Sequence, residues 1–393
     1  MYTSFFRKAM LGDTATLALD FSAGTMPTAV TFTRADSTAR ATFIDASGYV
    51  KTVTAAGDPR FDYTGGVAKG LLIEAAATNL LLRSQDLSSA AWSVYDMPSR
   101  TVNAATGPDN LTSATRCVFN GQYSLVYQGA NTSAGITYTF SFWAKRESGN
   151  TALVIHHNNS ATGQNTAFTI TNDWQRYQVS VLGKIGNGLI EWGVQDRNAS
   201  GHGTILLWGT QVEESATASS LIPTSTASLT RLADDAVIRS TAWTSLYAQP
   251  GAMVVEFYRG AYGATDRSIM CTDPTAARHW HLKSANASAT AQIAFSSGSP
   301  VTQTGLTAGL NKVAIAWNAP TPTASFDLCV NGAAPTFGGS NVGTTLSTWL
   351  TLGSQSTTGV SGSGTWNAYL NNSIKSVKYY TGLTYAEMQA KTT

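Results

Sequence analysis

Hydrophobic and polar residues alternate in short runs along most of the chain. In residues 138–145, Tyr138, Phe140 and Phe142 fall on one face of a strand, and Thr139 and Trp143 fall on the other. Turn residues separate such runs, as at 172–173, 186–188 and 331–332. Regularly spaced short strands of this kind are typical of antiparallel sandwiches. The pattern therefore predicts an all-β chain of tandem β-sandwich (jelly-roll) domains.

Two short segments depart from the strand pattern. Thr384 followed by Glu387 fits a capping box, which predicts a C-terminal helix from Tyr385 to about Lys391. Residues 1–16 form a short N-terminal arm. Its apolar residues could make one face of a docking helix inserted into a partner protein, or the arm could be a frayed terminus. These apolar residues are Phe5, Phe6, Met10 and Leu11.

The chain has 393 residues, which predicts two or three domains. We expect a β module over 17–84, a jelly roll over 85–235 and a sandwich over 236–393, after the arm of residues 1–16. The linker between the last two domains is predicted near 225–239. No repeat of fixed period is present, so the sequence does not support a propeller, solenoid or β-helix.

Charged residues make up 12% of the chain and the net charge is +2. An average soluble protein carries about 25% charged residues. No basic stripe is visible, so we expect no nucleic-acid partner. No apolar stretch reaches the roughly 20 residues of a membrane span. The first residues also make a poor signal peptide, because no apolar run follows the basic start.

Motifs of the common enzyme classes are missing. The chain has no His-Glu-x-x-His, Gly-x-Ser-x-Gly or Walker sequence, and no Cys/His cluster with zinc spacing. Its scattered acids, Glu147, Glu191, Asp196, Glu213 and Glu214, follow no motif that would order a glycosidase pair. The sequence therefore predicts a protein that is not an enzyme.

Metal binding has weak support. His279 and His281 share one face of a strand, either as a metal pair or as a solvent-facing pair. Loop oxygens of Asp327, Asn331 and Asp266 could hold a structural calcium ion, although ordinary turn residues explain them as well. No cofactor is certain.

Sugar binding is the sharper hypothesis, because sugars stack on aromatic rings and bond to short polar groups. One stretch of the predicted jelly roll mixes aromatic, imidazole, amide and carboxylate groups on adjacent strands and loops. The candidate glycan-binding residues are His156, His157, Asn158, Trp192, Gln195 and Asp196.

Three stretches resemble known families. Residues 19–81, with Val30–Arg34, Ala41–Gly48, Pro59–Tyr63 and Gly70–Glu74, resemble the N-terminal module of phage head-spike and tail-fibre proteins. Residues 208–234 are similar to the closing strand of a carbohydrate-binding-like jelly roll. Residues 374–389 resemble the end of a laminin-G or concanavalin-like sandwich.

Within the first stretch, a few residues stand out for a structural role. Gly48 closes the Asp45–Gly48 turn, which needs a positive φ. Bidentate pairing of arginines with carboxylates could fix the loops of a module so poor in charge. The structural candidates are Arg34, Asp45, Gly48, Arg60, Glu74 and Asn79.

The resemblance implies a virion surface protein, made in the host cytoplasm without a signal peptide. It would be a spike or fibre subunit, docked to other virion proteins through its N-terminus and homo-oligomeric, with a trimer favoured. Its β domains would bind host cell-surface polysaccharide. A purely structural capsid decoration protein and a secreted bacterial lectin remain alternatives.

Overall fold

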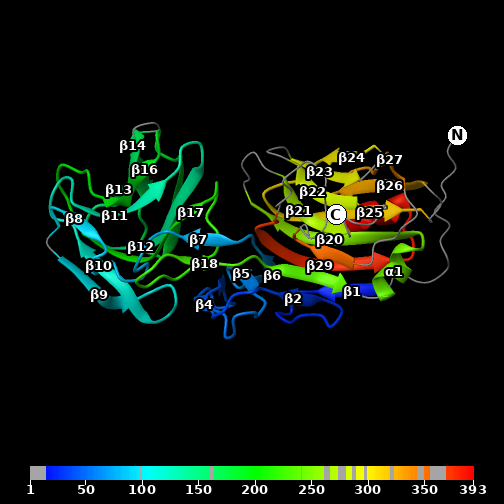
Figure 1. The fold of residues 1–393 in the computed structure, drawn as a ribbon, viewed down its shortest axis with the longest axis horizontal. Coiled ribbons are helices and arrows are strands. Elements are labelled where there is room, and N and C mark those ends of the chain that lie inside the picture. The colour runs from blue at the N-terminus through cyan, green and yellow to red at the C-terminus, as the bar shows by residue number, and fades with distance from the viewer. Residues whose placement is uncertain are drawn as a thin grey trace. The chain divides into compact units, whose positions relative to one another are not determined.

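The computed structural model describes residues 15–97, 99–159, 163–239, 241–260, 266–272, 280–285, 289–295, 299–318, 323–342, 349–354 and 369–393. Within these residues the chain forms antiparallel strands β1–β29 and two short helices, so the predicted all-β fold is confirmed (Figure 1). The strands fall into two compact units. Unit 1 comprises residues 1–37, 54–75 and 232–393, and unit 2 comprises residues 38–53 and 76–231.

Unit 1 is a sandwich of two sheets. Sheet A has the order β27 (Thr336–Val342), β26 (Thr323–Val330), β25 (Gly309–Trp317), β20 (Gly251–Arg259), β29 (Asn372–Tyr380), β6 (Val67–Ile73), β5 (Phe61–Thr64), and β1 (Leu17–Asp20) also pairs with β29. Sheet B has the order β2 (Thr31–Thr33), β19 (Asp235–Arg239), β28 (Trp349–Leu352), β21 (Arg267–Thr272), β22 (Trp280–Ala285), β23 (Thr290–Phe295), β24 (Val301–Thr304). Alternation turns one face of each strand inward, where Trp280, Trp317 and Phe326 join the core.

Two helices complete unit 1. Helix α1 (Thr241–Tyr247) places Trp243 and Tyr247 in the core as a stacked pair, with ring centroids 5.5 Å apart. Helix α2 (Tyr385–Thr392) begins with the expected capping box, in which Thr384 and Glu387 satisfy each other's backbone N–H groups. It packs through Met388 on small residues of the outer face of sheet A. The predicted C-terminal helix is thus confirmed.

Unit 2 is a second sandwich, of two five-stranded sheets in the described residues. Sheet C has the order β14 (Gly163–Thr169), β13 (Ala152–Asn159), β16 (Gly188–Gln195), β11 (Leu125–Thr132), β8 (Ser93–Tyr95). Sheet D has the order β15 (Gln175–Leu182), β12 (Thr137–Ser148), β17 (Thr204–Glu214), β10 (Thr112–Val118), β9 (Ser99–Thr106). Phe140, Phe142 and Trp192 lie in the core between them.

The outer face of sheet D is also covered. The hairpin of β3 (Thr42–Ile44) and β4 (Val50–Thr52) packs through Val50 on Trp143 and Trp208. Its turn has Gly48 at φ +84°, and the Asp45 carboxylate accepts the N–H groups of Ser47 and Tyr49 at 2.9 Å. Strand β12 is therefore buried on both faces, which explains why its polar face is as inaccessible as its apolar face.

The Asn79 side chain joins the end of strand β7 (Ala77–Asn79) to two segments of unit 2 that are distant in sequence. Strand β7 pairs with β18 (Leu229–Arg231). The Asn79 side chain is fully buried, donates to the carbonyls of Thr210 and Ile222 at 3.0 Å, and accepts the N–H groups of Leu81 and Val212 at 3.1 Å. A side-chain amide can donate two hydrogen bonds and accept two at its oxygen, so Asn79 makes all the hydrogen bonds that its amide allows.

The residues 17–84, for which the sequence suggests one module, are divided between the two units. Strands β1, β2, β5 and β6 belong to the sheets of unit 1, whereas β3, β4 and β7 belong to unit 2. The chain passes between the units after Ser37, Val53, Ala75 and Arg231. Of the predicted jelly roll over 85–235, residues 85–231 form unit 2 together with 38–53 and 76–84, and residues 232–235 belong to unit 1.

A buried ion network lies close to these crossings in unit 1. Arg60 contacts Glu74 at 2.6 Å and also pairs with Asp234. Arg34 contacts Asp36 at 2.9 Å and Asp234 at 3.0 Å. Burial opposes the charge of the Arg60 guanidinium, but the adjacent carboxylates of Asp234 and Glu74 outweigh burial and raise its pKa. The network therefore joins three distant segments of the chain through charges that water does not screen.

We predict that Asp234→Ala destabilises unit 1 strongly, because it leaves two buried guanidinium groups without their shared carboxylate. Removing one partner of a buried ion pair lowers the free energy of unfolding by about 3–5 kcal/mol. Urea denaturation of the full chain measures this. The control is Lys375→Ala, which removes a partly exposed pair with Glu256 and should change stability by less than about 1 kcal/mol. Equal effects of the two variants would contradict the role of the network.

Candidate functional site

Strand alternation separates the residues that the sequence grouped as a glycan site. His157 and Trp192 are register partners on β13 and β16, and both point into the core of unit 2. Trp192 is 0% exposed and its ring lies 6.0 Å from that of Phe140. The imidazole of His157 contacts the Thr166 hydroxyl at 3.0 Å. In this structure, neither ring offers a face on which a sugar could stack.

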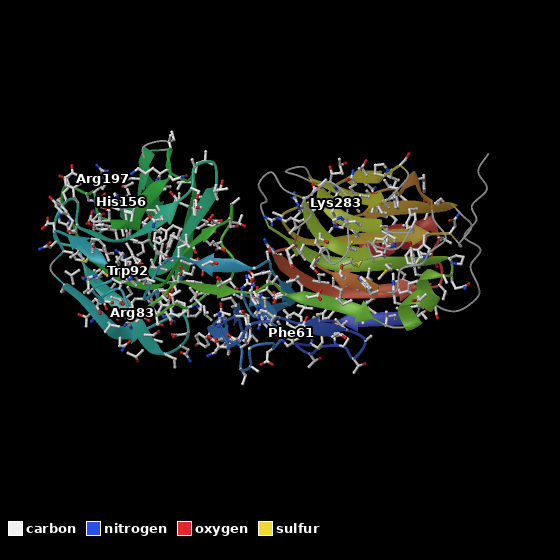
Figure 2. All side chains as sticks on the ribbon, viewed as in Figure 1. Phe61, Arg83, Trp92, His156, Arg197 and Lys283 are labelled. Atoms are coloured by element: carbon white, nitrogen blue, oxygen red, sulfur yellow. The ribbon has the colours of Figure 1, made fainter. Side chains whose placement is uncertain are left out.

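The other predicted residues lie on the outward face of sheet C or beyond it. His156 faces outward on β13, where Figure 2 labels it, and Asn158 is exposed on the same strand. Gln195 is nearly buried and donates to the carbonyl of Tyr123 at 3.3 Å. Asp196 is fully buried and accepts hydrogen bonds from Asn198 and His202. Of the six, His156 and Asn158 therefore offer outward side chains that are at least partly exposed.

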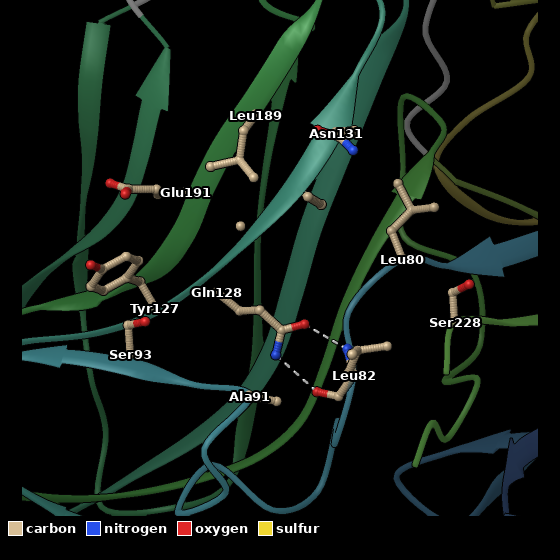
Figure 3. A pocket seen from close by; sticks show the side chains of 12 residues that line it. Leu80, Leu82, Ala91, Ser93, Tyr127, Gln128, Asn131, Leu189, Glu191 and Ser228 are labelled. Atoms are coloured by element: carbon tan, nitrogen blue, oxygen red, sulfur yellow. Dashed lines mark hydrogen bonds between the residues drawn. The ribbon is translucent and has the colours of Figure 1, made fainter. Parts of the chain in front are cut away.

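A groove lies next to His156 on the outward face of sheet C. Register places Ser93, Tyr127, Gly193, His156 and Asn165 in one row across five strands. The groove begins at Tyr127 and runs toward the C-terminal end of β11 and the N-terminal end of β16. Its volume is about 650 Å³ (Figure 3). Its lining comprises Leu80, Leu82, Ala91, Ser93, Tyr127, Gln128, Gly129, Ala130, Asn131, Leu189, Glu191 and Ser228.

Two walls of the groove differ in how they are held. Tyr127, Gly129 and Asn131 alternate along β11 onto the same face as Leu189 and Glu191 of β16. The opposite wall is the segment Leu80–Leu82, which the Gln128 amide fixes by accepting the Leu82 N–H at 2.6 Å and donating to its carbonyl at 3.1 Å. Figure 3 shows both bonds. The first wall is thus held by the backbone pairing of β11 with β16, and the second by a side-chain amide.

The groove offers a limited set of chemical groups. The Tyr127 ring is partly exposed and lies 6.4 Å from the His156 ring in an edge-to-face arrangement. The Glu191 side chain is 31% exposed and its carboxylate lies 3.6 Å from His156 Nε2. Asn131, Ser93 and Ser228 are exposed and supply amide and hydroxyl groups. A cavity of 300–1,000 Å³ with an apolar lining and a few polar groups is typical of a small-ligand site.

A second, smaller cavity of about 310 Å³ lies between the β3–β4 hairpin and sheet D. Lys51, Gln85 and Asp109 line it, together with Trp208 and Leu221. Trp208 is 1% exposed and packed edge-to-face against Trp143, so its ring face is taken by the protein.

Sequence reasoning did not include Tyr127, Asn131 or Leu189. The strand 125–132 carries a signal, since Val126 and Ala130 alternate with Tyr127 and Asn131. Gly129 in its centre weakens that signal, because glycine is usually read as a turn. Glu191 appears among the scattered acids, but nothing in sequence places it opposite β11.

The predicted calcium ligands have other partners. The Asn331 side chain accepts the Lys312 N–H at 2.8 Å and donates to Gly305 and Asn311. Asp266 pairs with Lys283 at 2.5 Å. Burial raises the pKa of Asp327 to about 6, although a hydrogen bond from Tyr385 acts in the opposite direction. Among the described residues no three His, Cys, Asp or Glu side chains gather as a metal site would require. In the structure these three side chains contact other groups of the protein, and the calcium hypothesis gains no support from them.

Several predicted functional residues fall outside the described residues. The docking residues Phe5, Phe6, Met10 and Leu11 lie there, as does His279. His281 is described and is 3% exposed, so it does not face solvent. Neither described helix is long and apolar enough to cross a membrane.

Comparisons with known proteins identify no family. No family model matches the chain, and no curated protein matches it. Among solved structures, similar chains include the CBM40 of Ruminococcus gnavus IT-sialidase, alone and bound to α2,3-sialyllactose. Each is 17% identical and covers 39% of this chain and 87% of the module, with a TM-score of 0.29. At this TM-score the likeness is too slight to carry any function from those modules to this chain.

We predict a pH dependence of stability from Asp327, which lies near helix α2. Its pKa is raised from 3.8 to about 6 in the folded chain, so the folded state binds more protons than the unfolded state between these values. The contribution of Asp327 to stability should then fall as pH rises from about 4 to about 6 and stay lower above that. Asp327→Asn should therefore match the wild type at pH 4 and exceed it at pH 8 in urea denaturation.

Tyr385→Phe provides the companion variant. The Tyr385 hydrogen bond lowers the pKa of Asp327, so its loss should move the fall in stability to higher pH. An unchanged pH profile in both variants would contradict this account of Asp327.

Proposed function

We propose that this chain is a non-catalytic glycan-binding protein and that the groove on sheet C is its binding site. The observation that carries the proposal is the partly exposed Tyr127 ring, set on one rigid face beside Glu191 and Asn131. A tyrosine ring presents an apolar face with a polar tip, and carboxylate and amide groups bond to neighbouring hydroxyls. Sugars present these same two kinds of surface.

The lining favours binding over hydrolysis. Canonical glycosidases place two carboxyl groups about 5–9.5 Å apart across the scissile bond. Among the twelve lining residues, all in the described part of the chain, Glu191 supplies a carboxylate and no other aspartate or glutamate is present. His156 is the ionisable neighbour of Glu191, and an imidazole cannot replace the second carboxylate in that mechanism.

We further propose that the chain is a surface spike or fibre subunit of a phage-like particle. The support is the sequence resemblance of residues 19–81, together with low charge and an all-β fold. In this proposal the N-terminal arm with Phe5, Phe6, Met10 and Leu11 docks to other virion proteins. The chain forms a homo-oligomer, with a trimer favoured, and displays its groove to host polysaccharide. A capsid decoration protein or a secreted lectin would be the alternative.

Tyr127→Ala should weaken binding to surface polysaccharide of the host at least tenfold, because stacking of a sugar ring depends on the aromatic face. Isothermal titration of the purified chain with polysaccharide fragments measures the affinity. Two controls should bind as the wild type does. Tyr123→Ala removes an exposed tyrosine outside the groove, and Gln85→Ala alters the second cavity. Loss of affinity in Gln85→Ala but not in Tyr127→Ala would move the site to that cavity.

Deletion of residues 1–14 should abolish incorporation into particles while leaving glycan affinity unchanged, because it retains every described residue. Mass spectrometry of purified particles measures incorporation, and cryo-electron microscopy locates the β units. Normal incorporation of the truncated chain would refute docking through the arm. A chain found free outside cells and in no particle would favour the secreted lectin.

A further inference from the structure

The charge of the groove restricts its ligand. Its lining holds one carboxylate, that of Glu191, and no lysine or arginine among the residues that the structure describes, and the His156 imidazole 3.6 Å from that carboxylate lies outside the lining. A like charge brought close to a carboxylate without a compensating cation is disfavoured. A sugar that bears a carboxylate would meet this repulsion. The groove therefore suits a neutral sugar, whose hydroxyls can donate to the Glu191 oxygens.

The apolar part of the lining restricts the ligand further. Leu80, Leu82 and Leu189 line the same groove, and Leu189 is 48% exposed. Gly129 makes this placement possible, since a Cβ atom there would lie 2.7 Å from Leu189 Cδ1. The leucine side chain thus lies across β11 where any larger residue would displace it. A half-exposed leucine in a cavity favours a ligand that covers it with an apolar group.

The polar and apolar groups are close enough to act on one sugar. Leu189 and Glu191 are two residues apart on β16, which sets them about 6.6 Å apart on one face. Tyr127 and Asn131 flank them from β11. A single pyranose can then place hydroxyls at Glu191 while a substituent reaches Leu189. A plain hexose has no methyl group to place on the leucine.

Building on the glycan-binding proposal, we propose that the groove selects a neutral sugar with a methyl-bearing substituent. A 6-deoxyhexose and an N-acetylated hexosamine share this chemistry. The methyl group covers Leu189, and the ring hydroxyls donate to Glu191. One methyl or methylene group in an apolar pocket changes selectivity by about 10-fold or more, and an open groove should realise the lower end of this range.

The test compares sugars on one polymer scaffold by biolayer interferometry with the full chain. The panel is rhamnose, N-acetylglucosamine, glucose and glucuronic acid, with lactose against sialyllactose as a second neutral and acidic pair. Rhamnose or N-acetylglucosamine should bind about 5- to 10-fold more tightly than glucose, and their order identifies the substituent. Glucuronic acid and sialyllactose should bind more weakly than their neutral counterparts.

Variants tie the selectivity to the groove. Leu189→Ser should remove the preference for the methyl-bearing sugar while neutral sugars still bind. Glu191→Gln should reduce the difference in affinity between neutral and acidic sugars. Leu182→Ser, at another exposed leucine of unit 2 outside the groove, should change neither.

The outcomes separate this inference from the function on which it rests. Equal affinity for glucose and for the methyl-bearing sugars, or tightest binding of an acidic sugar, would overturn the inference and leave glycan binding intact. Failure of the whole panel while host polysaccharide still binds would do the same. Failure of both the panel and the host polysaccharide would overturn the proposed function as well.

Discussion

The fold of unit 1 depends on a network of buried ion pairs that joins segments far apart in the chain. The carboxylate of Asp234 pairs with both Arg34 and Arg60, and Glu74 is a second carboxylate partner of Arg60. Charged groups buried this deeply are tolerated when every one has a partner, and they strongly disfavour any arrangement in which one is missing. Each of the three segments lies within a few residues of a point where the chain passes between the units. The sequence suggested that arginines of this stretch pair with carboxylates, with Arg60 and Glu74 among the candidates, but it assigned no specific pair and did not include Asp234.

Local features of the fold could be predicted from sequence because their causes are local. The alternation of Tyr138, Phe140 and Phe142 results from the two-residue repeat of a strand, and the turn at Gly48 results from its need for positive φ. The capping box of α2 is of the same kind. Helix α1 was missed, since its seven residues carry no cap or charge signal and Trp243 holds it through packing. The division of residues 17–84 between units depends on partners more than 100 residues away, which no local pattern records.

The candidate site shows the same limit. The sequence placed its candidate residues near the sheet that carries the proposed groove, because His156 and the outward face of β16 lie beside that groove. It could not tell inward from outward residues across neighbouring strands, and so it grouped the buried Trp192 with the exposed Asn158. Tyr127 lies opposite Gly193 only through pairing of β11 with β16, more than 60 residues later. Sites built from cross-strand neighbours become visible when register is known.

The pairing of β1 with β29 has a consequence for synthesis on the ribosome. Leu17 is opposite Tyr379, so the first strand meets its partner only after about 360 further residues have been translated. At about 5–20 residues per second this takes roughly 20–70 s. Residues 38–53 and 76–231 are all complete well before then, which allows unit 2 to fold while the early strands of unit 1 remain without a sheet. The nascent chain must keep those strands from pairing wrongly throughout this interval, either through their short length or with the help of a chaperone.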